Sequence, residues 1–259
     1  MNASCGIAIM AKASAPGRTK TRLVPPLSYD EAATLNTAFL QDIADNVLRA
    51  AASTSIAGYA AFAPPGSQGF FHRILPASIG LIDACWANFG DCLYHTIEQV
   101  LARGHRSAVV LNSDSPTLPT ALLAHTAEIL AQPGERAVLG PSDDGGYYLL
   151  GLKTAHRRLF EEIAWSTDGV AQATLERARE TNLDLHVLPV WYDVDDAEGL
   201  RRLFDETRRR QPKLGNGRRA DALEPNYPAS TAALIECCWP NGEFAARGAG
   251  KLQAATASL

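Results

Sequence analysis

The chain lacks the sequence patterns that mark several common classes of protein. Its five cysteines are odd in number and form no C-x-x-C pair, which argues against a disulfide framework or a cysteine zinc site and favours reduced thiols. No apolar run is long enough to span a bilayer, and the N-terminus has no signal-peptide layout. The net charge of −4 is not the basic excess of a nucleic-acid binder. We therefore expect a cytoplasmic globular protein with no membrane span and no nucleic-acid partner.

Several catalytic signatures are absent as well. The chain has no G-x-x-x-x-G-K-[ST] loop and no G-x-G-x-x-G fingerprint, which excludes the usual P-loop and dinucleotide-binding sequences. The G-x-S-x-G elbow of serine hydrolases is missing. The six histidines form no cluster with metal-ligand spacing. Any catalytic site therefore has to be built from other residues.

What is present begins with a short apolar segment that runs into a basic loop. Residues 6–11 are apolar and too few for a helix, so they predict a buried strand. The loop that follows contains a proline, a glycine and four cations: Pro16, Gly17, Lys12, Arg18, Lys20 and Arg22. Backbone N–H groups and cations that converge after a strand can hold a phosphate group. From the pattern alone, phosphate binding is slightly favoured over an ordinary solvated loop.

Strands and helices alternate along the rest of residues 1–210. Apolar runs predict further strands at 55–62, 79–82, 108–112, 137–139 and 185–188. Helical spacing and capping residues predict helices at 28–52, 89–103, 119–131, 167–180 and from about 196 to 210. This alternation predicts an α/β domain with a parallel or mostly parallel sheet, whose ligands bind beyond the carboxyl ends of the strands.

The C-terminal part has a different composition. From Gln211 onward proline, glycine, asparagine and arginine become frequent, so we expect residues 211–259 to be a linker and a weakly structured tail. Residues 234–239 are apolar enough to dock as one turn. The predicted domain is therefore residues 1–210.

Asp114 is the first candidate for a metal ligand. It directly follows the predicted strand at 108–112, opposite the basic loop, and one or two carboxylates with substrate phosphates suit Mg²⁺. A purely structural role, capping or turning the chain before Pro116, is the alternative, and we weigh metal binding above it. Asp195 is less clear, because Asp195 and Glu198 have the spacing of a capping box, which we favour over a second metal carboxylate.

A turn and a tryptophan are candidates for substrate contacts. Asp143–Gly146 reads as a tight turn, and its paired glycines would also let a ligand approach the backbone. The candidate substrate residues are Asp144, Gly145, Gly146, Tyr147 and Trp165. Tyr147 and Tyr148 point to opposite faces if a strand follows, so that one stacks on a base or sugar while the other lies in the core. The segment 165–167 is an N-cap by first interpretation and a substrate wall by second.

Four segments taken together resemble a known family. They are IAIMAKASAPGRTKTRL, VVLNSDSPTLP, LGPSDDGGYYLLGL and IAWST, in this order. They resemble a bacterial family grouped with the nucleotide-diphospho-sugar transferases, whose members are described as glycosyltransferases encoded near radical-SAM enzymes, including ones linked to arsenosugar synthesis. Residues 20–23 also look like phospholactate guanylyltransferases, and residues 193–200 like the closing motif of sugar-nucleotide and molybdenum-cofactor nucleotidyltransferases. The resemblance covers about residues 6–205.

The resemblance implies a GT-A fold, which is a Rossmann-like three-layer α/β/α sandwich. By motif match, the phosphate-binding residues would be Lys12, Gly17, Arg18, Lys20 and Arg22, and Lys20, Arg22 and Asp114 would be catalytic. Asp114 would hold Mg²⁺ or Mn²⁺, and Asp195 becomes an even choice between a second metal ligand and a cap. One departure is that Ser113-Asp114-Ser115 replaces the D-x-D motif of many GT-A glycosyltransferases. A single acid at this position is common in nucleotidyltransferases.

We therefore expect a Mg²⁺-dependent transferase that uses an activated nucleotide. The first choice is glycosyl transfer from a nucleotide-diphospho-sugar to a small-molecule acceptor. The alternative is transfer of a nucleotidyl group from an NTP to a phosphorylated small molecule, with release of pyrophosphate. A catalytically silent nucleotide-binding or scaffold protein on the same fold is a third possibility, which the retained cations and acids disfavour.

Overall fold

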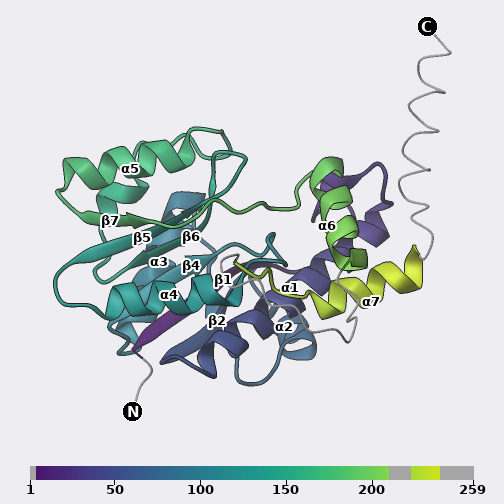
Figure 1. Ribbon diagram of the computed structural model, residues 1–259, viewed down its shortest axis with the longest axis horizontal. Helices are drawn as coiled ribbons and strands as arrows, with labels where there is room; N and C mark the ends of the chain where they lie inside the picture. The colour runs from purple at the N-terminus through teal and green to yellow at the C-terminus, as the bar shows by residue number, and fades with distance from the viewer. Residues whose placement is uncertain (1–3, 210–222, 240–259) are drawn as a thin grey trace, which may run out of the picture.

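The computed structural model describes residues 4–209 and 223–239, and these residues form a three-layer α/β structure (Figure 1). Its centre is one sheet of seven strands in the order β3-β2-β1-β4-β6-β5-β7. The strands are β1 Cys5–Lys12, β2 Ile56–Ala63, β3 Gly80–Asp83, β4 Ser107–Leu111, β5 Arg136–Pro141, β6 Tyr147–Leu152 and β7 Asp184–Val187. Only β6 runs antiparallel to its neighbours, so the expected α/β fold with a mostly parallel sheet is confirmed.

Helices cover both faces of this sheet. The helices are α1 Tyr29–Ala51, α2 Gln68–Ile74, α3 Phe89–Ala102, α4 Thr120–Ala131, α5 Val170–Glu180, α6 Ala197–Arg209 and α7 Ala229–Cys238, with short 3-10 turns η1 Thr21–Leu23 and η2 Arg157–Phe160. Side chains of α1, α2 and α4 pack on one face. Side chains of α3, α5 and η2 pack on the other. Among the described residues no helix is long and apolar enough to cross a membrane.

Strand β1 illustrates how the sequence produces these layers. Ile7 and Ile9 belong to the core cluster under α1, while Ala8 between them belongs to the cluster under α3. Successive side chains of a strand point to opposite faces, so a strand buried on both sides has to be apolar throughout. The parallel partners β2 and β4 flank β1 in register.

Helix α1 begins and packs as its sequence predicts. The side chain of Ser28 accepts a hydrogen bond from the backbone N–H of Glu31, and the Glu31 carboxylate accepts one from the backbone N–H of Ser28, which is a complete capping box. Apolar residues four apart, such as Leu35, Phe39 and Ile43, are fully buried. This spacing places them on one side of the helix, facing the sheet and the C-terminal helices.

Three details differ from the sequence-based expectations. Helix α2 lies between the strands predicted at 55–62 and 79–82, where no helix was expected. Helix α5 begins at Val170 rather than at residue 167, so residues 165–167 precede it. Within residues 211–259, for which we expected weak structure, α7 packs against α1 and α6 (Figure 1). The division into a domain at 1–210 and a separate linker and tail stays a prediction.

Candidate functional site

Two adjoining cavities lie beyond the carboxyl ends of the central strands. The smaller cavity has a volume of about 310 Å³ and is lined by the expected cations Lys12, Arg18, Lys20 and Arg22. The larger has a volume of about 570 Å³ and extends over the β5–β6 turn and the segment before α5. Met10, Arg22, Asp114 and Asp195 line both cavities. Residues that were separate candidates in the sequence therefore share one site.

Lys20 stands where the two cavities meet. Its Nζ atom lies 2.7 Å from Oδ1 of Asp114 and 2.8 Å from Oδ1 of Asp195, and it donates a hydrogen bond to the carbonyl oxygen of Val194. Only 5% of the side chain is exposed. Burial alone would lower the pKa of Lys20, but the charges of both aspartates and their hydrogen bonds outweigh burial and raise it. The ammonium group therefore stays charged between two carboxylates.

Backbone hydrogen bonds bring Asp195 to Asp114, although they are far apart in the sequence. The N–H of Val194 donates to the carbonyl oxygen of Asp114 over 2.8 Å. Trp191, three residues before Val194, forms an isolated parallel bridge with Ser142, next to the end of β5. The segment after β7 is thus pinned along the edge of the sheet, and its carboxylates point into the site.

The capping-box interpretation of Asp195 was wrong. The residue that caps α6 is Asp196, whose Oδ1 accepts hydrogen bonds from the backbone N–H groups of Glu198 and Gly199. This leaves the Asp195 side chain available for Lys20. The neighbouring acid Asp193 also faces the site. Burial raises the pKa of Asp193 to about 7, and the negative charges of Asp144, Asp195 and Asp114 contribute to the rise.

The arrangement fits a divalent cation bound together with phosphates. Among the described residues no group of three or more His, Cys, Asp or Glu side chains has the geometry of a protein-only metal site. Mg²⁺ needs only one or two carboxylates when substrate phosphates and water complete its shell. Asp114 and Asp195 supply two partly exposed carboxylates that already converge on one cation, the Lys20 ammonium. Their oxygens are also the ligand type that Mg²⁺ and Mn²⁺ accept.

Most of the expected substrate residues line the larger cavity. Asp144, Gly146, Tyr147 and Trp165 do so. Tyr148 is instead fully buried in the core and donates its hydroxyl hydrogen bond to the carbonyl oxygen of Pro189. The two tyrosines therefore lie on opposite faces of the sheet as expected, and stacking of Tyr147 on a base or sugar stays a prediction.

Two other expected site residues do not line a cavity. Gly145 has a φ of +87°, and a Cβ there would collide with the carbonyl oxygen of Asp168, so its bare backbone accommodates the chain itself. Gly17, with a φ of +71°, turns the basic loop and lines neither cavity. Both glycines shape the site rather than form its surface.

The N-cap interpretation of the segment 165–167 was also wrong. Gly169 is the N-cap residue of α5 and makes no side-chain capping bond. The Thr167 hydroxyl donates to the carbonyl oxygen of Ala164 within the loop. The indole of Trp165 forms an edge-to-face contact with Phe89 at the start of α3, with ring centroids 5.3 Å apart. The substrate-wall interpretation is the one consistent with this position.

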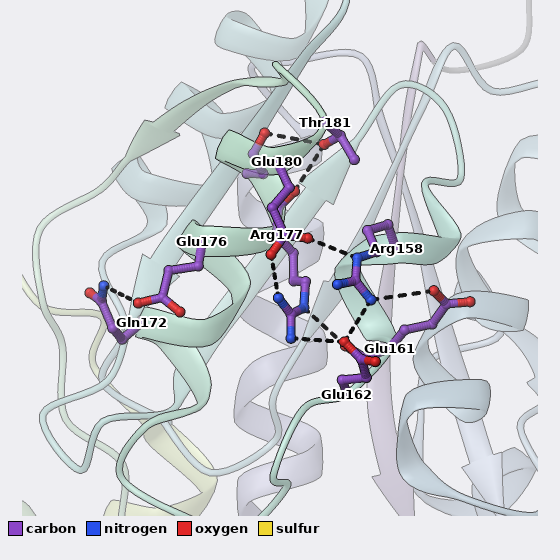
Figure 2. Close-up of polar contacts among 9 residues, drawn as sticks. Arg158, Glu161, Glu162, Gln172, Glu176, Arg177, Glu180 and Thr181 are labelled. Atoms are coloured by element: carbon purple, nitrogen blue, oxygen red, sulfur yellow. Dashed lines mark hydrogen bonds and ion pairs between the residues drawn. The ribbon is translucent and has the colours of Figure 1, made fainter.

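A network of charged side chains fixes the loop that carries Trp165 (Figure 2). Arg158 of η2 contacts Glu162 at 2.9 Å and Glu180 of α5 at 2.8 Å. Arg177 of α5 contacts the same two acids. The network holds η2 and the start of the loop, at Glu162, against the last turns of α5, and the middle of the loop forms one wall of the larger cavity.

Sequence reasoning missed several residues of the cavity wall, including three with polar or aromatic side chains that could contact a ligand. These three are Phe89, Asn112 and Asp168. Asn112 follows β4 directly, which is the same signal that identified Asp114. Phe89 and Asp168 carried no such signal, because their places depend on tertiary contacts: Phe89 contacts Trp165, and the backbone of Asp168 lies against Gly145.

A comparison of sequence profiles finds one family. A profile described as an uncharacterized protein conserved in bacteria (DUF2064) matches residues 46–167. This range includes Asp114 and the Asp143–Gly146 turn but leaves out the basic loop and Asp195. A comparison with curated proteins finds no match.

Solved structures resemble the chain over most of its length. A protein from Desulfovibrio desulfuricans G20, provisionally named a nucleotide-diphospho-sugar transferase, is 26% identical with a TM-score of 0.75, and the match covers 93% of this chain and 96% of that one. A CMP:2-keto-3-deoxy-manno-octonic acid synthetase solved with CTP is 11% identical, with a TM-score of 0.51 over 79% and 98% of the two chains.

A third structure has the same fold at low identity. A cytidylyltransferase from Leptospira borgpetersenii is 10% identical, with a TM-score of 0.50 over 93% of this chain and 96% of that one. At such identities the two nucleotidyltransferases show the fold alone. The name of the Desulfovibrio protein is that of the group we expected, so the resemblance is confirmed, and all three structures share the fold of this chain.

Proposed function

We propose that the protein is a Mg²⁺-dependent transferase that moves a glycosyl group from a nucleotide-diphospho-sugar to a small acceptor. The observation that carries this proposal is the junction at Lys20, Asp114 and Asp195. A basic cavity suited to phosphates lies on one side of this junction, and a larger cavity with an aromatic wall lies on the other. The likeness to the Desulfovibrio protein supports the same donor class.

The chain's own residues would act by holding charge and excluding water. Lys12, Arg18 and Arg22 are exposed cations on the rim of the basic cavity and would bind the donor's diphosphate through charge-assisted hydrogen bonds. Asp114 and Asp195 would hold the metal. A bound Mg²⁺ would neutralise the charge that builds up on the leaving diphosphate. Lys20, already fixed between the two carboxylates, would orient them and add positive charge close to that position.

Nucleotidyl transfer is the second candidate, and one observation favours it. Four cations around a cavity of about 310 Å³ are enough for a triphosphate. In that reaction the same groups would stabilise an in-line displacement in which pyrophosphate leaves. The single acid at Ser113-Asp114-Ser115 is compatible with it.

Product analysis separates the two candidates. The purified protein is incubated with Mg²⁺ and panels of nucleotide-sugars and NTPs, and the released products are identified. Release of a nucleoside diphosphate from one nucleotide-sugar, dependent on an added acceptor, is the expected result. Release of pyrophosphate from an NTP would replace the first choice by the second. If neither donor is consumed, with or without Mg²⁺, the proposal of an active transferase is wrong.

A further inference from the structure

We propose that the larger cavity is an acceptor subsite for a compound that carries hydroxyl or amino groups and an apolar face, and no phosphate or carboxylate. The inference rests on the proposed function, because it assumes that the second substrate enters this cavity. It goes further by naming the acceptor's chemical class. It also bears on the two candidate reactions, since the nucleotidyl-transfer alternative requires a phosphorylated acceptor.

The first argument is the charge of the cavity wall. Five aspartates line it, and Arg22 is the one cation among its described lining residues. Two of the five, Asp114 and Asp195, share the single positive charge of Lys20, so one negative charge of this pair stays uncompensated. Of the remaining three, Asp144 and Asp168 have no ion-pair partner among the described residues, and Asp193, whose pKa is about 7, is partly charged at neutral pH. An anionic group placed among them would meet like charges in a partly enclosed space, where repulsion is less screened than in water.

The second argument is the direction of the unused hydrogen bonds. Carboxylate oxygens accept hydrogen bonds and cannot donate them. The Oδ1 atom of Asn112, whose amide nitrogen donates to the Ser115 hydroxyl, is buried and has no hydrogen-bond partner within the described protein. The Tyr147 hydroxyl, which can donate as well as accept, is also buried without a partner and does not by itself favour either kind of ligand. A wall that is rich in acceptors recognises ligand donors, namely hydroxyl or ammonium groups, whereas an ionised phosphate offers only further acceptors.

The third argument is the aromatic surface opposite these acids. Trp165 stands between Phe89 and Tyr147, with edge-to-face contacts at centroid distances of 5.3 and 6.5 Å. Phe89 is 51% exposed and lines the same cavity, so its ring is accessible to a ligand there. Aromatic rings bind the apolar C–H face of a sugar ring by packing, and they attract cations through their negative faces. Both ligand types lack negative charge.

The acids and the aromatic wall are held together by the fold. Gly145 allows the backbone of residue 168 to approach, and the backbone N–H of Ala171 donates to the carbonyl oxygen of Gly145 over 2.9 Å. Asp144 and Asp168 therefore stand on two segments fixed against each other. The N–H of Gly146 donates to Oδ1 of Asp144, which orients that carboxylate. The arrangement is a built surface rather than a chance gathering of exposed side chains.

The test uses the fluorescence of Trp165, taken as the difference between the full-length protein and its Trp165→Phe variant. Caesium, iodide and neutral acrylamide are compared as quenchers. We expect quenching by caesium, relative to acrylamide, to exceed quenching by iodide. This difference should shrink in an Asp144→Asn, Asp168→Asn double variant, in which three of the five aspartates remain. Asp143→Asn is the matched control, because Asp143 lies in the same turn but faces Arg202 rather than the cavity. Iodide quenching equal to or above caesium quenching would overturn the proposal.

The ligand class is tested with matched sugars on the same signal. Glucose, glucosamine and glucose 6-phosphate are titrated in the presence of Mg²⁺ and inorganic pyrophosphate, which keeps the basic cavity supplied with an anion. We expect glucose or glucosamine to change the Trp165 signal at concentrations roughly tenfold or more below glucose 6-phosphate, and the double variant to narrow this gap. Equal or better binding of glucose 6-phosphate, or no response to either uncharged or amino sugar at tens of millimolar, overturns the proposal. None of these readouts needs a donor to be consumed, so they can fail or succeed independently of the proposed reaction.

Discussion

Lys20 binds the two carboxylates that line both cavities. Its ammonium group is buried, charged and shared between Asp114 and Asp195, and its backbone adopts a left-handed φ of 50° at the start of η1. Arg22, two residues later, is exposed and lines both cavities without an ion pair to either acid among the described contacts. The two cations belong to the same loop but have different physical roles, which makes them a matched pair for mutation.

Lys20→Ala and Arg22→Ala should therefore differ in stability but not in their effect on the donor. Lys20→Ala leaves two neighbouring carboxylates without their shared cation, so it should lower the free energy of unfolding by about 1–3 kcal/mol. Arg22→Ala should leave it within about 0.5 kcal/mol. Either change should weaken the true donor roughly tenfold to a hundredfold. Denaturant titration and donor titration measure the two effects. Equal stability of both variants would contradict the role of Lys20 as a fixed cation.

The loss of affinity for NTP, divided by the loss of affinity for nucleotide-diphospho-sugar, is the more specific readout. If both variants weaken NTP binding much more than nucleotide-diphospho-sugar binding, and the unmodified protein prefers NTP, nucleotidyl transfer replaces glycosyl transfer as the proposal. If neither donor is affected, the basic loop is an ordinary solvated surface.

Asp114→Asn should abolish the metal-dependent part of nucleotide binding. The amide keeps the shape of the side chain but removes the charge that attracts Mg²⁺ and one partner of Lys20. The loss should be at least roughly tenfold in affinity at a fixed Mg²⁺ concentration, by calorimetry with and without the metal. Asp143→Asn, an exposed acid outside both cavities, is the control. Unchanged metal-dependent affinity in Asp114→Asn would remove this residue from the site.

At the residue scale, the sequence predicted which residues lie at the site better than it predicted which side chains contact one another. Asp114 and the cations were identifiable because each follows a strand that ends at the ligand edge. The choice between Asp195 and Asp196 as the helix cap was not, because two adjacent acids both have capping spacing and only the backbone geometry selects one. The contact between Lys20 and Asp195 spans most of the chain and leaves no local pattern.

The β5–β6 turn and the loop before α5 pack against each other at Gly145, and substitution of Gly145 tests how tightly they pack. Gly145→Ala would drive a methyl group into the carbonyl oxygen of Asp168, on a backbone with a φ of +87°. Gly134 has the same φ of +87°, and an added methyl group there would meet nothing within 4 Å, so Gly134→Ala isolates the backbone cost. We expect Gly134→Ala to cost about 1–2 kcal/mol and Gly145→Ala about 2 kcal/mol more, with loss of the Trp165 quenching pattern. Equal costs in thermal denaturation would show that the two loops are not packed tightly.

Helix α7 is joined to α1 by a carboxylate whose titration can be followed. Asp42 is 1% exposed and accepts hydrogen bonds from the backbone N–H groups of Ser230 and Thr231, at the start of α7. Burial raises the pKa of Asp42 from 3.8, and these hydrogen bonds only partly oppose it. Because the folded pKa is above the unfolded one, the folded state binds the proton more tightly. Its contribution to stability is complete below pH 3.8 and is lost as the pH rises through the folded pKa.

Comparison of the parent with Asp42→Asn at several pH values checks this sign. The stability of the parent relative to Asp42→Asn should decrease as the pH rises from below about 4 toward neutrality, in denaturant titrations. Asp45→Asn, on the exposed side of the same helix, should show no such trend. A parent that gains stability relative to Asp42→Asn over this range would mean that the hydrogen bonds outweigh burial.

At the element scale the strands were the easiest to predict. A strand buried on both faces leaves an unbroken apolar run, and β1, β2 and β4 were found within a residue or two on this basis. Helix α2 was missed because its short sequence follows a proline-rich turn and only Phe71 is buried by it. The start of α5 was misplaced because Thr167 satisfies the capping preference locally, while the packing of residue 168 on Gly145 delays the helix.

At the scale of the whole molecule, the strand order creates the site. Strands β1, β4 and β6 are central neighbours, so the basic loop, Asp114 and the β5–β6 turn meet at one edge. The segment after β7 then crosses back to bring Asp195 to Lys20. The alternation of elements predicted the class of fold. The path of the segment after β7 could not be predicted, because no sequence periodicity indicates along which edge of the sheet such a segment runs.

The C-terminal segment closes back on the same site, which makes its removal informative. The backbone N–H of Asn226 donates to the carbonyl oxygen of Thr117, and its side-chain amide donates to that of Pro116, just after Asp114. Trp239 is buried in the cluster formed by η1, α1 and α6. Truncation after Arg210 would remove both contacts and expose apolar surface on α1. A large buried side chain such as Trp239 is worth about 3–5 kcal/mol, so we expect a truncated chain that is much less stable than the parent, or insoluble.

Asn226→Ala separates the stability role of this segment from its effect on the site. It removes one buried hydrogen bond, so it should cost only about 1–3 kcal/mol while the fold persists. Because Pro116 and Thr117 belong to the loop of Asp114, the metal-dependent affinity for nucleotide should also fall in this variant. Leu223→Ala, at an exposed position of the same segment, is the control. If truncation after Arg210 leaves the melting temperature and nucleotide affinity near those of the parent, residues 211–259 are dispensable, and residues 1–210 form the complete transferase domain that the sequence predicts.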